Sequence, residues 1–121
     1  ILAQADTVLV MGPFRQELAD LGVLQLPVQP LKQLLSQLAE QHQIYDVLVE
    51  AGATLSTAFL QEQLVDELIS YVAPTLLGQS ARTMFNAEFS LMAEQLRFKL
   101  RDVTRLGDDV RFRLIPFQET L

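Results

Sequence analysis

The sequence predicts an α/β domain with a core of parallel strands and a C-terminal antiparallel hairpin. Helix-like and strand-like segments alternate through most of the chain. Near its middle, the apolar run at residues 47–49 is continuous, which is typical of a parallel strand covered on both faces. The C-terminal part instead alternates apolar and charged residues on either side of Gly107, the pattern of a hairpin with one solvated face.

The first half of the chain contains two short strands and two helices. Residues 7–12 (TVLVMG) are aliphatic and end in Gly-Pro, so we expect a strand and a turn. Residues 14–21 are weakly amphipathic, and residues 23–28 alternate but contain Pro27, which indicates an edge strand or a strand end. The segment PLKQLLSQLAEQH predicts a helix with Pro30 at its first position. Its apolar positions recur at helical spacing: Leu31, Leu34, Leu35 and Leu38.

The second half begins with the parallel strand at residues 47–49. A helix is expected to open at Ala53 or Thr54, and a further strand to begin near Glu67 and stop at Pro74. The apolar side of this helix comprises Leu55, Ala58, Phe59 and Leu64.

The C-terminal part is expected to be a loop followed by the hairpin. Residues 77–90 are rich in small and polar residues and indicate an exposed loop or short helical turns. Residues 96–106 and 110–117 are expected to form the hairpin around a turn at residues 107–109. The apolar inner face comprises Leu96, Phe98, Leu100 and Val103 against Val110, Phe112 and Leu114. The solvated face carries Arg97, Lys99, Arg101, Arg111 and Arg113.

The composition limits the possible functions. We expect residues 1–121, of which 50% are hydrophobic, to form one domain, and because the sequence from Ile1 reads as a chain already in progress, we expect that domain to be incomplete. The formal charge of -6 disfavours nucleic acid and acidic membranes as partners. The absence of cysteine excludes disulfides and thiolate metal sites, and the cytoplasm is the expected compartment.

The stretch DVLVEAGATLSTAFL, residues 46–60, places a carboxylate and a glycine where an apolar strand gives way to a helix. In an open α/β sheet such strand ends face the ligand crevice, and the next helix offers unpaired N–H groups to an anion. We expect Gly52 to let the backbone approach a pyrophosphate with a dihedral angle that other residues avoid, and Thr54 and Ser56 to cap the helix and donate hydroxyl hydrogen bonds. Glu50 suits sugar hydroxyls or ring N–H groups. A purely structural strand-to-helix turn remains an alternative.

The longer stretch VLVEAGATLSTAFLQEQLVDELISYVAPTLLGQSARTMF resembles the reductase domain of the riboflavin-biosynthesis deaminase/reductase family. That family has a strand ending Val-Glu-(Gly/Ala)-Gly, followed by Thr-Leu, a helix, Leu-Val-Asp-Glu, a strand and Ala-Pro-x-Leu-Leu-Gly. The match covers residues 46–85, and residues 107–109 also fit. The resemblance implies a dihydrofolate-reductase-like fold, a three-layer α-β-α arrangement around a mixed sheet. It begins partway through the family's domain, so the contacts to nicotinamide and substrate phosphate are expected before Ile1.

The resemblance also implies an activity: NADPH-dependent reduction of the ribosyl group of 5-amino-6-(5-phosphoribosylamino)uracil to a ribityl group, in a homodimer. It implies that Glu50 contacts the substrate. The segment against the NADPH pyrophosphate would comprise Gly52, Ala53, Thr54, Leu55, Ser56, Thr57 and Ala58. No catalytic residue or metal ligand is assigned, and the family's zinc-deaminase signature, His-x-Glu with Pro-Cys-x-x-Cys, does not occur in this chain. Two alternatives stay open: a non-catalytic folding and dimerisation fragment, and a reductase of a related pyrimidine or pterin.

Other polar residues fit structural or solvent-exposed roles better than chemical ones. His42, the only histidine, lies at the polar end of a helix, and Arg82 lies in an expected loop. Asp66 and Glu67 have no histidine or third carboxylate near them in sequence, which favours a structural role, and the resemblance implies that they lie at a helix-strand junction.

Overall fold

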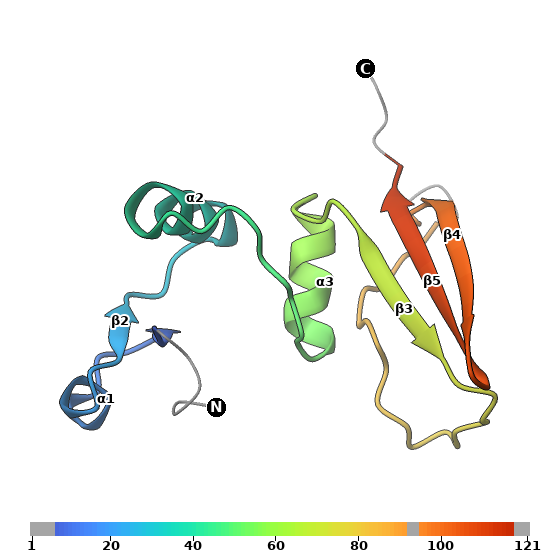
Figure 1. Cartoon of the computed structure of the whole chain (residues 1–121), viewed down its shortest axis with the longest axis horizontal. Helices are drawn as coiled ribbons and strands as arrows, with labels where there is room; N and C mark the ends of the chain where they lie inside the picture. Colours follow the sequence, from blue (N-terminus) through green and yellow to red (C-terminus); the bar gives the residue numbers. More distant parts are fainter. Residues whose placement is uncertain (1–6, 92–94, 118–121) are drawn as a thin grey trace. The chain divides into compact units, whose positions relative to one another are not determined.

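The computed structural model describes residues 7–91 and 95–117 and divides the chain into two units, Ile1–Val47 and Leu48–Leu121. Each unit contains its own sheet, one parallel and one antiparallel (Figure 1). The expected mixed α/β class is therefore confirmed, whereas a single domain over residues 1–121 stays a prediction. Within the described ranges, no helix is both long enough and apolar enough to cross a membrane.

The first unit begins with two short parallel strands joined by a short helix. The elements are β1 (Leu9–Met11), α1 (Gln16–Asp20) and β2 (Leu24–Leu26). They lie inside the segments that the sequence predicted. β2 ends directly before Pro27, which cannot donate a backbone hydrogen bond to continue the ladder.

Helix α1 ends in a glycine-dependent motif. The Gly22 N–H donates to the Ala19 carbonyl at 2.9 Å, and the Val23 N–H donates to the Leu18 carbonyl at 3.0 Å. This is the Schellman pattern, and it requires the left-handed conformation that Gly22 adopts, with φ of 72°. A glycine here turns the chain from α1 into β2.

Helix α2 (Leu31–His42) confirms the predicted helix but shifts its start by one residue. Pro30 precedes the helix as its N-cap, and its carbonyl accepts the Leu34 N–H at 3.0 Å. Leu31 is 8% exposed and belongs to the core of this unit. The helix stops at Gln43, which adopts a left-handed conformation.

Residues 47–49 do not form the predicted strand. They pair with no strand in the described part of the chain, and the residues Val47, Leu48 and Val49 are 48%, 79% and 37% exposed. An apolar run predicts burial, but a strand also needs a neighbour with a free edge. The two units divide between Val47 and Leu48, in the middle of this run. The prediction is therefore wrong for this structure.

The part of the second unit that the structure describes contains one helix and three antiparallel strands. These are α3 (Ala53–Gln61), β3 (Leu68–Val72), β4 (Phe98–Leu106) and β5 (Asp109–Pro116), and β5 is the central strand of the sheet. Figure 1 shows α3 beside the β3 edge. The strand expected from Glu67 onward is present, but it pairs antiparallel with β5, so the predicted parallel core is limited to β1 and β2.

The hairpin of β4 and β5 confirms the expected pairing of apolar residues. Leu100 lies opposite Leu114, and Val103 lies opposite Phe112. The register shifts between Leu100 and Asp102. Residues three apart in a regular strand lie on opposite faces, but the bulge at this point keeps Leu100 and Val103 on the same face. Gly107 supplies the positive φ, 65°, that the tight turn needs.

Helix α3 contributes the most buried residues of the second unit. Phe59 and Leu60 are 7% and 8% exposed. Leu55 is 45% exposed and Leu64 lies beyond the helix, so the predicted apolar side is only partly correct. The described residues between β3 and β4 form neither helix nor strand, as the loop prediction required.

Candidate functional site

Helix α3 begins without a side-chain cap. Gly52 is its N-cap residue, and its carbonyl accepts the Ser56 N–H at 3.1 Å. Neither Thr54 nor Ser56 caps the helix, which corrects the expectation from the sequence. The first-turn N–H groups of α3 are therefore not satisfied by a capping side chain, and the positive end of the helix dipole is left for solvent or an anion.

Gly52 does not adopt the special dihedral angle that the sequence suggested. Its φ of -73° and ψ of 172° are accessible to any residue. A Cβ at this position would meet no heavy atom within 4 Å. The fold therefore does not require glycine here, and the space beside the backbone is open to a ligand.

The three hydroxyls of α3 make different hydrogen bonds. Ser56 Oγ donates to the Ala51 carbonyl at 3.3 Å, which turns its hydrogen back toward the preceding turn. Thr57 Oγ1 accepts the Asn86 backbone N–H at 3.0 Å, and Thr54 Oγ1 accepts from Asn86 Nδ2 at 3.2 Å. Thr57 is only 4% exposed, whereas Thr54 is exposed. Thr54 is thus the hydroxyl best placed for a ligand.

Glu50 lies in the segment of the sequence between α2 and α3 and is exposed. Among the described residues, no hydrogen bond or ion pair of its carboxylate is found. Its strand is absent, so its place at a crevice edge and its contact with substrate stay predictions. Its carboxylate lies two residues before the N-cap of α3 and is accessible to solvent.

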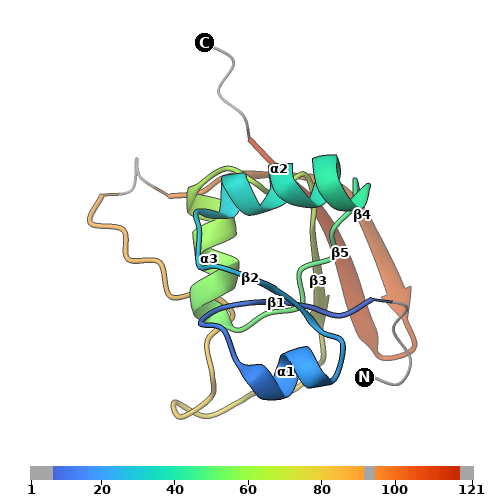
Figure 2. The same cartoon turned by 90° about the vertical axis from the view of Figure 1, so that its left-hand side faces the viewer.

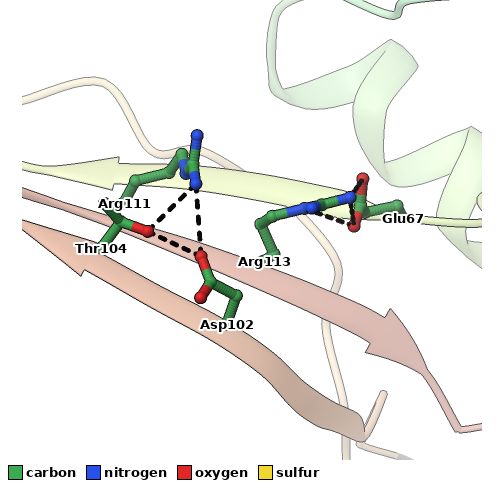
Figure 3. Close-up of polar contacts among 5 residues, drawn as sticks. All are labelled: Glu67, Asp102, Thr104, Arg111 and Arg113. Atoms are coloured by element: carbon green, nitrogen blue, oxygen red, sulfur yellow. Dashed lines mark hydrogen bonds and ion pairs between the residues drawn. The ribbon is translucent and has the colours of Figure 1, made fainter.

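The antiparallel sheet carries a polar cluster that we call the sheet cluster: Glu67, Asp102, Thr104, Arg111 and Arg113 (Figure 3). Arg113 binds Glu67 through two hydrogen bonds, from Nε at 2.8 Å and from a terminal nitrogen at 3.0 Å. These bonds lower the pKa of Glu67 and raise that of Arg113. Glu67 is therefore a structural residue that ties the start of β3 to β5, as the sequence suggested.

The rest of the sheet cluster lies on β4 and β5. Arg111 donates to Asp102 at 3.2 Å and to Thr104 at 3.0 Å, and the Thr104 hydroxyl donates to Asp102 at 2.7 Å. The Thr104 hydrogen bond, and then Arg111, lower the pKa of Asp102. The side chain of Arg111 is 31% exposed and that of Arg113 is 37% exposed, so the expected solvated face is only half-exposed here.

The first unit contains an open apolar pocket of about 420 Å³ at the carboxyl ends of β1 and β2. Its lining is Gly12, Pro13, Phe14, Gln25, Leu26, Pro27 and Val28. The side chain of Gln25 binds the backbone of Arg15: its Oε1 accepts from the Arg15 N–H at 2.7 Å, and its Nε2 donates to the Arg15 carbonyl at 2.9 Å. The pocket has the volume of a small-molecule site and lies at the end of a parallel pair where ligands commonly bind.

The remaining candidates show no chemical arrangement in the described part of the chain. His42 is half-buried in the last turn of α2, and Arg82 is exposed. No group of three metal-ligating side chains is found among the described residues.

Sequence reasoning missed two features. Asn86 was not singled out, although it is the only asparagine of the chain and lies in an otherwise irregular segment. The pocket of the first unit was also missed. Its lining includes the two prolines that follow the parallel strands, Pro27 directly after β2 and Pro13 two residues after β1.

Comparisons with known proteins agree with the resemblance seen in the sequence. RibD of Acinetobacter baumannii has a solved structure that is 72% identical, with a TM-score of 0.92 over 97% of this chain and 33% of that one. Riboflavin biosynthesis protein RibD of Escherichia coli is 43% identical over 83 residues, which are 68% of this chain and 22% of the relative. A 5-amino-6-(5-phosphoribosylamino)uracil reductase of Buchnera aphidicola is 39% identical over 77 residues, 63% of this chain and 37% of the relative.

The chain thus spans only a minor part of the length of each of these relatives. A family model, the RibD C-terminal domain, matches residues 4–112 and so covers most of the chain. This chain belongs to the RibD C-terminal domain family.

Proposed function

We propose that this chain forms part of an NADPH-dependent reductase that converts the ribosyl group of 5-amino-6-(5-phosphoribosylamino)uracil to a ribityl group. The observation that carries the proposal is family membership, together with the Buchnera aphidicola relative that is named for this reductase activity. We also propose that residues 1–121 belong to a single domain of the three-layer dihydrofolate-reductase-like type. The cytoplasm remains the compartment predicted from composition.

The start of α3 fits the pyrophosphate of the cofactor. The proposed contact segment is Gly52, Ala53, Thr54, Leu55, Ser56, Thr57 and Ala58. Within it, the uncapped first turn, the open space at Gly52 and the exposed Thr54 hydroxyl are available to an anion. Ser56 and Thr57 hold the helix in place, since their hydroxyls contact Ala51 and Asn86. When bound, NADPH supplies the hydride.

Glu50 is proposed to bind the substrate. Its carboxylate is exposed and can accept hydrogen bonds from sugar hydroxyls or ring N–H groups. The ribosyl ring must open to an imine or aldehyde equivalent before the anomeric carbon can be reduced. A carboxylate beside the sugar can assist that opening by moving a proton between the ring oxygen and the exocyclic nitrogen.

Gly52→Ala tests the cofactor site without disturbing the fold. The φ of Gly52 suits alanine and the new Cβ meets open space, so we expect unchanged stability and an NADPH dissociation constant raised about tenfold. Gly78→Ala is the matched control, because its Cβ also meets nothing and its φ lies outside the left-handed region. Binding by Gly52→Ala equal to that of the control would remove Gly52 from the site.

Glu50→Gln tests the substrate role in the natural full-length protein. We expect turnover and substrate affinity to fall, since the amide keeps the size of the side chain but loses its charge and proton-transfer capacity. Glu62→Gln, at the exposed C-cap of α3, is the control for removing one negative charge nearby. If Glu50→Gln changed neither kcat nor the substrate dissociation constant, the role of Glu50 would have to be abandoned.

A homodimer is proposed from the apolar face of the antiparallel sheet. Val72, Leu100 and Val103 share this face and are 49%, 54% and 49% exposed. The same face favours the alternative in which the chain is a non-catalytic folding and dimerisation unit. Titration of NADPH by fluorescence, with sedimentation, separates the two: saturable micromolar binding supports the reductase, and a dimer without binding supports the alternative. Turnover of a pterin or another pyrimidine in place of the proposed substrate would support the remaining alternative, a reductase of a related pyrimidine or pterin.

A further inference from the structure

Asn86 attaches the segment that follows β3 to helix α3. Its backbone N–H donates to Thr57 Oγ1 at 3.0 Å, and its side-chain Nδ2 donates to Thr54 Oγ1 at 3.2 Å. The two threonines are three residues apart and lie on the same side of the helix. Figure 2 shows the connecting segment, gold to orange, running past α3.

The two hydrogen bonds differ in what they leave available. A threonine hydroxyl that accepts one hydrogen bond still has a hydrogen to donate. Thr57 is buried, so its hydroxyl is closed to a ligand. Thr54 is the second residue of α3 and lies in its first turn. Its hydroxyl is exposed, and no acceptor for its hydrogen is found among the described residues.

We propose that Asn86 is a positioning residue for the anion bound at the start of α3. Its Nδ2 donates to the Thr54 hydroxyl oxygen, so the hydrogen of this hydroxyl points away from the loop, toward the phosphate oxygens. This inference rests on the proposed function, because the anion is the pyrophosphate of the cofactor. Its chemistry requires an amide: a carboxylate at residue 86 would accept the Thr54 hydrogen and add a negative charge beside the phosphate.

The backbone and side-chain bonds of Asn86 separate an anchoring role from a positioning role. The bond to Thr57 uses the backbone N–H and is kept when the side chain is replaced. The bond to Thr54 uses only the side-chain amide. A side-chain substitution at Asn86 therefore tests the positioning of Thr54 while the anchor of the loop on α3 remains.

The experiment measures the NADPH dissociation constant by fluorescence titration, and Tm, in the natural full-length protein. We expect N86A to weaken NADPH binding several-fold and N86D to weaken it by about tenfold or more, with little change in Tm. Gln79, an exposed amide of the same loop, provides matched controls: Q79A and Q79D make the same changes away from Thr54 and are expected to bind NADPH as the wild type does.

Variants of Thr54 show whether Asn86 acts through it. T54V is expected to weaken binding, and T54S, which keeps the hydroxyl, is expected to restore it. The double variant N86A/T54V is expected to bind no worse than T54V alone, because Asn86 has nothing to position once the hydroxyl is gone. Additive losses would show that Asn86 acts independently of Thr54 and would overturn the inference.

The outcomes distinguish this inference from the proposed function. A wild-type protein that binds NADPH saturably, with N86A and N86D binding equally well, overturns the role of Asn86 and leaves the reductase proposal standing. A wild-type protein without saturable NADPH binding overturns the cofactor site itself. A lower Tm for N86A at unchanged affinity shows a purely structural contact and also overturns the inference.

Discussion

Thr57 connects α3 to the loop after β3, and we expect the stability of the protein to depend on this connection. It is 4% exposed, and its Oγ1 accepts the Asn86 N–H at 3.0 Å. Thr57→Val keeps the shape of the side chain but removes this acceptor, and a hydrogen bond of this kind contributes about 0.5–1.5 kcal/mol, because the N–H of the exposed Asn86 can turn to water instead. The apolar methyl group that replaces the buried hydroxyl offsets part of this loss, so we expect a net loss of up to about 1 kcal/mol in the free energy of unfolding.

Thr57→Ser separates the hydrogen bond from the packing. It keeps the oxygen and loses one methyl group, at a cost of about 0.8 kcal/mol. Urea unfolding followed by circular dichroism gives the free energies, and amide hydrogen exchange at Asn86 identifies the cause. We expect exchange at Asn86 to accelerate about tenfold in Thr57→Val and to stay near wild type in Thr57→Ser. Equal protection of Asn86 in both variants would refute the reasoning.

Two further predictions concern the antiparallel sheet. The hydrogen bond and charge of Arg113 lower the pKa of Glu67 in the folded protein. The pair therefore stabilises the fold at pH values above the pKa of Glu67 in the unfolded chain, about 4.3. This stabilisation is lost as the pH falls through the lower pKa of the folded protein. In urea unfolding at decreasing pH, Glu67→Gln is therefore expected to lose less stability than the wild type. Glu17→Gln, at a side chain that is 83% exposed, is the control and is expected to behave as the wild type does. Parallel curves of unfolding free energy against pH for the wild type and Glu67→Gln would contradict this prediction. Gly107→Ala is expected to lower the free energy of unfolding by about 1 kcal/mol, because φ is 65°, and equal stability with Gly78→Ala would argue against strain at the turn.

Most of the elements predicted from local patterns are found in the structure. The leucine spacing of α2 and the alternation of the hairpin depend on residues close together in the chain, so the sequence contains enough information for both. The segment at residues 47–49 was predicted with the same reasoning and is not a strand. Its pairing depends on a partner far away in sequence, which an apolar run does not specify.

The candidate site divides in the same way. The sequence located the start of α3 within a residue and drew attention to Gly52, but it assigned the helix cap to the wrong groups. The true partners of Thr54 and Thr57 come from Asn86, about thirty residues later in the chain. Local capping rules cannot find such a contact, because they consider only residues that are neighbours in the sequence.

The sequence by itself determined the family, the mixed α/β class and the segments that become helices and hairpin, since these follow from motifs and from periodicity within short windows. The tertiary structure decided which strands pair, that β5 is central, and which hydroxyls of α3 remain available. It also turned the charged hairpin face into the sheet cluster, by placing Glu67 against Arg113. Hydrogen bonds and ion pairs between distant residues depend on where the chain brings them, and that placement is set by the whole unit rather than by any one segment.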